Sequence, residues 1–345
     1  MCKLPLQVCL ALALSHSLAA SSYDKYMSKA REAAARRDFA LAEREYQAAL
    51  REVHKNPGDM RVFLAYEGLS AAAERQRDLA AAEEYLRDAL AARQQTGFGP
   101  VAELPAWLDF KQFYAGQRRW EDAAATADRL AAIWKESGAG GEPGTAQYLS
   151  AAGFFYYSAG DYAKAEERYR AALQILEAAM GESAALAQAG AKLAITLAAE
   201  DKPDEAESQF KRALAMTQNS GWLDLVFRDH RDVLRKLGWD VNATVPENGR
   251  LFHVGKGVSA PRPISHREPE YTEVARSHRI VGTVILYLEF NRAGVPVNIQ
   301  VLEPLGFGLD EKAIAAVETW RFRPAVKDGQ PVEVAATVEV NFRLL

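Results

Sequence analysis

The stretch "DYAKAEERYRAAL" (Asp161–Leu173) carries the pattern that decides the fold of most of this chain. Tyr162, Ala165 and Tyr169 follow one another at intervals of three and four residues, which places them on one face of a helix. Four more segments share the pattern: "DFALAEREYQAAL" (Asp38–Leu50), "DLAAAEEYLRDAL" (Asp78–Leu90), "RWEDAAATADRLA" (Arg119–Ala131) and "KPDEAESQFKRAL" (Lys202–Leu214). Their central alanines are Ala42, Ala82, Ala123, Ala165 and Ala206, spaced by 40, 41, 42 and 41 residues. A repeat of this period predicts an all-α solenoid.

These segments resemble the second helices of tetratricopeptide repeats. The resemblance implies that the small alanine lets two helices approach and that the ring of Tyr46, Tyr169 or Phe210 fills the groove between neighbours. Weaker first-helix segments precede three of them: "LAYEGLSAAAER" (Leu64–Arg75), "WLDFKQFYAGQ" (Trp107–Gln117) and "YLSAAGFFYYSAG" (Tyr148–Gly160). The period exceeds the usual 34 residues, so we expect longer helices or loops.

The array is expected to cover residues 21–240, with about five repeats and one closing helix. "SGWLDLVFRDHRDVLRKLG" (Ser220–Gly238) departs from the repeat pattern and predicts that helix, with Leu223, Leu225, Val226, Val233, Leu234 and Leu237 on its apolar face. A closing helix covers the apolar surface that the last repeat of a solenoid would expose.

Arrays of this family usually bind proteins, on a concave face lined by the first helices. The register predicts that this face contains Glu67, Glu74, Arg75, Gln112, Gln147, Phe154 and Tyr157. The lysines and asparagines with which the family grips a peptide carboxylate are missing, which argues against that mode. In the alternative interpretation, Phe154 and Tyr157 only pack between helices.

Residues 241–262 have the composition of a linker, with prolines and glycines. Beyond them the pattern changes to alternation. "VGTVILYLEF" (Val281–Phe290) and "VPVNIQVLE" (Val295–Glu303) predict two strands joined by a turn at Asn291–Gly294. "GLDEKAIAAVETW" (Gly308–Trp320) predicts a helix, and "QPVEVAATVEVNFRL" (Gln330–Leu344) predicts a terminal strand.

This order of motifs resembles the C-terminal domain of the TonB family. The resemblance rests on Tyr271 and the Ala275-Arg276 pair, Gly282 before the first strand, Leu309-Asp310-Glu311, and "WRFRP" (Trp320–Pro324) before a valine-rich strand. It implies a small α+β domain over residues 263–345, with an antiparallel three-stranded sheet covered by a helix. In "WRFRP" we expect Trp320 and Phe322 in the core and the arginines pointing away.

The family resemblance also implies a binding mode, in which an edge strand pairs with a segment of an outer-membrane transporter. The candidate edge residues are Val332, Val334, Ala336, Val338 and Val340, and further candidate contacts are Glu270, Tyr271, Arg321 and Arg323. An edge strand offers unpaired N–H and C=O groups, which strand addition uses. The chain departs from the family at Thr272, where proline is usual, and a helical array replaces the proline-rich spacer.

The N-terminus predicts export. Residues 1–20 combine Lys3, an apolar run and small residues, as in a signal peptide. The protein is then periplasmic; in the alternative, the segment is kept as an inner-membrane anchor. Both cysteines, Cys2 and Cys9, lie in this segment, so no disulfide is expected in the mature chain.

The sequence carries no recognisable catalytic constellation. Its six histidines form no HExxH pair, and there is no GxSxG motif. The net charge of −4 disfavours nucleic acid as a partner. We therefore expect no enzyme, metal, cofactor or small-molecule substrate, and protein partners instead.

Three functional hypotheses follow from these patterns. The first is a periplasmic adaptor whose repeats bind one protein and whose C-terminal domain binds another, such as a TonB-dependent outer-membrane transporter. The second is a membrane-anchored energy transducer for transport. The third is a periplasmic scaffold without a transport role.

Overall fold

The computed structural model describes residues 21–54, 59–97, 99–137, 141–217, 226–227, 230–239, 251–255, 257–277, 280, 282–303 and 305–342. The chain forms two compact units, Met1–Gly99 and Pro100–Leu345. The predicted signal segment 1–20, linker residues 241–250, Leu223 and Leu225 lie outside the described residues.

The described residues of the first unit form two helix pairs. Its helices are α1 (Ser22–Ala35), α2 (Phe39–Val53), α3 (Met60–Arg75) and α4 (Leu79–Gln94), each packed against the next. The predicted anchors Ala42 and Ala82 have no exposed surface. The ring of Tyr46 lies so close to Gly68 on α3 that a methyl group there would overlap it. The groove-filling role predicted for this ring is therefore confirmed.

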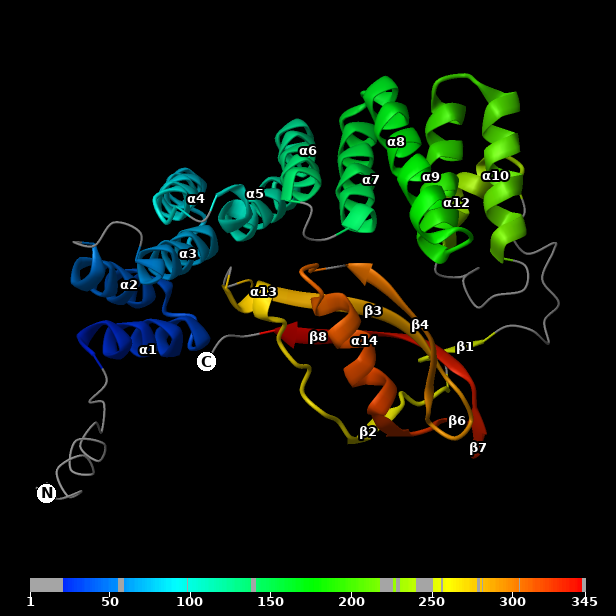
Figure 1. Ribbon diagram of the computed structural model, residues 1–345. Coiled ribbons are helices and arrows are strands. Elements are labelled where there is room, and N and C mark those ends of the chain that lie inside the picture. The colour runs from blue at the N-terminus through cyan, green and yellow to red at the C-terminus, as the bar shows by residue number, and fades with distance from the viewer. Residues whose placement is uncertain are drawn as a thin grey trace, which may run out of the picture. The chain divides into compact units, whose positions relative to one another are not determined.

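The second unit begins with the remaining repeats. These are η1 (Pro100–Glu103), α5 (Leu104–Gly116), α6 (Trp120–Ser137), α7 (Gly141–Ala159), α8 (Tyr162–Met180), α9 (Ala184–Ala199) and α10 (Pro203–Thr217). Figure 1 shows α5 to α10 following one another as packed neighbours. The anchors Ala123, Ala165 and Ala206 are fully buried. Arg168 on α8 binds Asp128 on α6 at 2.7 Å, which links two consecutive repeats.

Only part of the predicted closing helix lies within the described residues. Residues 226–227 are helical, and α12 covers Arg231–Lys236. Val226, Phe227 and Leu234 are buried against the last repeat around Phe210. Val233 and Leu237, which are predicted on the apolar face, are 37% and 39% exposed, whereas Leu234 of α12 is buried.

The C-terminal module follows in the same unit. It contains β1 (Phe252–His253), β2 (Arg262–Ser265), α13 (Glu273–Ser277), β3 (Gly282–Phe290), β4 (Pro296–Glu303), α14 (Leu309–Thr319), β5 (Arg321–Arg323), β6 (Ala325–Lys327), β7 (Gln330–Val332) and β8 (Val334–Phe342). The main sheet has the order β1-β8-β3-β4, with β3 antiparallel to both β4 and β8. The three predicted strands and the helix are confirmed, and the parallel strand β1 adds a fourth.

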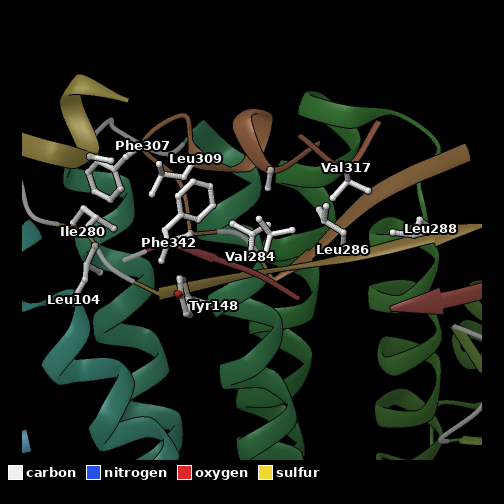
Figure 2. Packing of buried hydrophobic residues seen from close by; sticks show 14 of the residues in the cluster. Leu104, Tyr148, Ile280, Val284, Leu286, Leu288, Phe307, Leu309, Val317 and Phe342 are labelled. Atoms are coloured by element: carbon white, nitrogen blue, oxygen red, sulfur yellow. The ribbon is translucent and has the colours of Figure 1, made fainter. Parts of the chain in front are cut away.

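One core joins the module to the preceding repeats. Figure 2 shows Val284 and Leu286 of β3 facing Leu309 and Val317 of α14, with Tyr148 of α7 in the same cluster. The indole of Trp134 on α6 lies 5.9 Å from the ring of Tyr148 and 5.8 Å from the ring of Phe307. Because the module and these repeats share a core, the boundary between the two compact units falls inside the array, after residue 99.

Candidate functional site

The two strands that pair with β3 in the main sheet, β8 and β4, differ in how regularly they pair. Strand β8 pairs with β3 in one uninterrupted register, from Val334 opposite Phe290 to Phe342 opposite Gly282. Strand β4, at the other side, pairs with β3 through two register shifts. Asn298 in β4 has a left-handed backbone with φ 51°. Irregularities of this kind prevent an edge from accepting another strand. The candidate site is therefore the free side of β8.

The hydrogen bonds show which backbone groups of β8 face away from β3. The N–H of Phe252 in β1 donates to the carbonyl oxygen of Glu333 at 3.0 Å, so this carbonyl points to the free side. Backbone groups alternate between the two sides of a strand. The N–H and C=O groups of Thr337, Glu339 and Asn341 therefore also point to the free side.

The predicted edge residues do not all lie on this free side. Val332 belongs to β7, where it pairs with Ala325 across a hairpin. The turn at Asp328-Gly329 joins β6 to β7, and β8 begins only at Val334, so the prediction that Val332 lies in the terminal strand is wrong. Val334 lies between β3 and β1 and is buried. Ala336, Val338 and Val340 lie in the part of β8 that β1 does not cover, with their side chains packed on the core.

Two other predicted partner contacts, Glu270 and Tyr271, also make contacts within the module. The hydroxyl of Tyr271 donates to the carbonyl oxygen of Ile280 at 2.8 Å, and its ring packs edge-on against Phe342. Glu270 is exposed and lies 3.1 Å from the amine of Lys312, which lowers the pKa of the carboxyl. Partner contacts at these two positions stay a prediction.

In the "WRFRP" segment Phe322 lies in the core and the arginines lie outside it, as predicted, whereas Trp320 is only half-buried at the edge of the core. Phe322 is buried and packs edge-on against Phe290, with 4.5 Å between ring centres. The indole N–H of Trp320 donates to the carbonyl oxygen of Arg267 at 2.9 Å. Arg321 and Arg323 are exposed on β5, and Arg323 pairs with Arg262 on the short strand β2, which the sequence patterns did not predict.

The predicted concave residues of the repeats belong to both compact units. Glu67, Glu74 and Arg75 lie on α3 in the first unit, and Gln112, Gln147, Phe154 and Tyr157 lie on α5 and α7 in the second. Phe154 is 42% exposed, whereas Tyr157 is half-buried and packs on Tyr162 with 5.3 Å between ring centres. Tyr157 therefore fits the packing interpretation, and Phe154 stays a candidate contact.

A half-buried carboxylate shapes the loop before α14. Asp310 accepts the N–H groups of Leu305 and Gly306 at 2.7 and 3.0 Å. Burial raises its pKa to about 6, although these two hydrogen bonds act in the opposite direction. The motif Leu309-Asp310-Glu311 predicted only the start of a helix. The hydrogen bonds from Leu305 and Gly306 to Asp310 were not part of that prediction.

Two further findings concern the described residues alone. No helix in this part of the chain has the length and apolar character that a membrane crossing requires. Within the same residues, no three His, Cys, Asp or Glu side chains gather in a way that could hold a metal ion.

Comparison with known proteins supports both parts of the architecture. Residues 267–344 match the family model described as Gram-negative bacterial TonB protein C-terminal. Residues 104–178 and 144–219 match the tetratricopeptide repeat model.

Curated relatives cover only the C-terminal part. Protein TonB of Vibrio cholerae is 32% identical over 89 residues, which span 25% of this chain and 36% of that protein. Protein tonB2 of Pseudomonas aeruginosa is 34% identical over 77 residues, or 22% of this chain and 28% of that protein. The chain thus spans about a third of the length of these relatives.

Among solved structures, the "Podosopora anserina putative kinesin light chain nearly identical TPR-like repeats" is 15% identical, with a TM-score of 0.43 over 56% of this chain and 93% of that one. The chain therefore combines upstream helices that match the tetratricopeptide repeat family with a C-terminal module that matches the TonB C-terminal family.

Proposed function

We propose that this chain is an exported periplasmic adaptor. Its repeats bind one protein partner, and its C-terminal module binds a segment of another envelope protein, such as a TonB-dependent outer-membrane transporter, by strand pairing on β8. The matches to two protein-interaction families support a role in protein binding. No catalytic role is part of this proposal.

The observation that carries the proposal is the contrast between the two sides of the sheet. The free side of β8 belongs to a regular strand, and an extended segment added there gains a row of main-chain hydrogen bonds. The β4 side has register shifts and the left-handed Asn298, so it cannot offer such a row. β8 is also held on its other side by β3, which fixes its geometry before a partner arrives.

A proline at position 337 tests the strand-pairing step. Thr337→Pro removes an N–H that points to the free side and leaves the bonds to β3 in place, since proline is tolerated where its missing N–H would face solvent. Thr337→Ala is the matched control, because it removes the side chain and keeps the N–H. Each protein is used to capture partners from a Gram-negative outer-membrane extract. A protein captured by the wild type and by Thr337→Ala, and lost with Thr337→Pro in a variant that stays folded, supports the proposal.

Equal capture by all three proteins would rule out pairing along β8. Export is tested separately by sequencing the N-terminus of the protein isolated from the periplasm. A start near Ala20 or Ser21 supports the adaptor. A retained N-terminal segment would instead support the membrane-anchored transducer.

A further inference from the structure

The chain already places one of its own segments on the free side of β8. Strand β1 runs parallel to β8, with Phe252 opposite Val334 and His253 opposite Ala335. The amine of Lys327 lies over the ring of Phe252, 4.5 Å from its centre, and so helps to hold β1. The side of β8 is therefore able to accept a strand, and one end of it is occupied.

Beyond His253 the chain leaves β8. Gly255 and Val258 exchange two backbone hydrogen bonds, of 2.9 and 3.0 Å, which close a tight turn. Among the described residues, the only strands paired with β8 are β1 and β3. A second strand can therefore bind from residue 336 to residue 342, and β1 limits how far it extends toward residue 334.

The side chains beside this open stretch differ between its two faces. Ala336, Val338 and Val340 lie on the face that packs on the core, with Ala336 and Val338 partly uncovered. Thr337, Glu339 and Asn341 lie exposed on the other face. Glu339 is the central residue of the stretch and its only charge. Opposite charges directly across from each other stabilise a strand pair, whereas like charges destabilise it.

We propose that the open stretch of β8 selects a short alternating segment that carries a basic residue at its centre. Apolar residues of that segment lie beside Ala336 and Val338, and its lysine or arginine lies beside Glu339. The inference rests on the strand pairing proposed above and adds the chemistry of the partner.

A second copy of this chain fits the same stretch less well. Antiparallel pairing of two copies centred on the open residues would place Glu339 directly opposite Glu339 of the other copy. This like-charge pair disfavours self-association. The partner is therefore expected to be a different protein, with a positive charge in the paired segment.

The test is a charge swap on both sides of the pair. The probes are two labelled heptapeptides with blocked ends, Val-Thr-Val-Lys-Val-Thr-Val and the same sequence with Glu in place of Lys. The alternation is symmetric, so the central residue meets Glu339 in either strand direction. Binding of both peptides is measured by fluorescence anisotropy to the wild-type chain and to Glu339→Lys, with thermal unfolding to confirm that both proteins are folded.

We expect the lysine peptide to bind the wild type about two- to fivefold more tightly than the glutamate peptide. Glu339→Lys should reverse this preference. If both peptides bind both proteins equally, the charge selection is wrong and strand pairing stands. If no peptide binds either protein, strand pairing on β8 itself fails. If sedimentation shows that the wild type dimerises and that the peptides dissolve the dimer, the occupant is a second copy and the proposal is overturned.

Discussion

Left-handed backbone positions occur in both the repeats and the C-terminal module, in very different surroundings. Each helix-to-helix turn inside a repeat holds one such residue: Arg37, Arg77, Arg118, Gly160 and Asp201, with φ between 57° and 85°. Only one of the five is a glycine. At Gly160 no atom lies within 4 Å of where a side chain would begin. The repeat turns therefore tolerate any residue that can adopt the conformation.

The module has no such space at two of its left-handed glycines. A methyl group on Gly294 would collide with the backbone carbonyl of Phe322, and one on Gly306 would collide with the ring of Trp134. The difference teaches that a left-handed glycine has two separable roles. In the repeats it relieves backbone strain alone, whereas in the module it also lets two segments touch.

The largest effect is expected for Gly294→Ala. The change adds left-handed strain and pushes against backbone, which cannot rotate away. We expect the module to lose about 4 kcal/mol of unfolding free energy, measured by urea denaturation followed through tryptophan fluorescence.

Gly160→Ala is the matched control, because it adds the same strain in open space. It should cost about 1 kcal/mol. Equal losses in the two variants would contradict the distinction between the repeats and the module.

The next largest effect is expected for Gly306→Ala, at the contact between α6 and the module. The obstacle here is the Trp134 ring, a side chain that can shift when the contact opens. We expect a loss of about 3 kcal/mol. The tryptophan emission should also move to longer wavelength as Trp134 becomes exposed. An unchanged emission spectrum would mean that this contact does not hold the module to the repeats.

Asp310 and Asp161 extend the comparison to carboxylates that accept backbone N–H groups. In the repeats, hydrogen bonds from Lys164 lower the pKa of Asp161. In the module, burial raises the pKa of Asp310 to about 6. Because the folded pKa of Asp310 is above its unfolded value, its contribution to stability is complete below about pH 4 and is lost as the pH rises through 6.

Asp310→Asn removes this titration. The wild type minus variant difference in unfolding free energy should therefore be larger at pH 4 than at pH 7, by about 2 kcal/mol. Denaturation curves at several pH values measure it. A difference that stays constant with pH would show that Asp310 is as solvated as Asp161.

The repeats could be predicted from the sequence to a greater extent than the module, for a physical reason. The alanine anchors and the aspartates that begin their second helices act within one helix pair; Asp38, for example, accepts the N–H of Leu41 at 3.1 Å. In the module the strands follow from alternation, but the pairing of β1 with β8 and the contact of Gly306 with Trp134 join residues far apart in sequence. Val332 falls in β7 and not in the terminal strand, because strand register is not visible in a local pattern. Tyr157 is half-buried beside Tyr162, and a partner contact there stays a prediction.

A gain in stability is expected from Arg118→Gly. Arg118 is exposed and its backbone is left-handed with φ 57°, so this position is strained while its side chain stays exposed to solvent. Glycine removes the strain, and we expect a gain of about 1 kcal/mol, measured as a higher midpoint in thermal unfolding. Arg119→Gly, one residue later, is the control and should destabilise the protein. A loss of stability in Arg118→Gly would show that this arginine has contacts that the repeat turn requires.

The smallest effect on stability is expected for the double variant Arg321→Ser and Arg323→Ser. Both arginines are exposed on β5, and Phe322 between them keeps its place in the core. We expect a change of less than about 0.5 kcal/mol, because the exposed side chains remove little surface from water.

This variant separates packing from recognition in the segment where the two lie closest together. A folded double variant that captures the same outer-membrane protein as the wild type shows that the arginines are solvated. If capture is lost while the unfolding curve is unchanged, the arginines contact the partner, and the binding surface extends from β8 to β5. A large loss of stability would contradict the placement of both arginines outside the core. It would also show that substitutions at the surface cost more stability in the module than in the repeat turns.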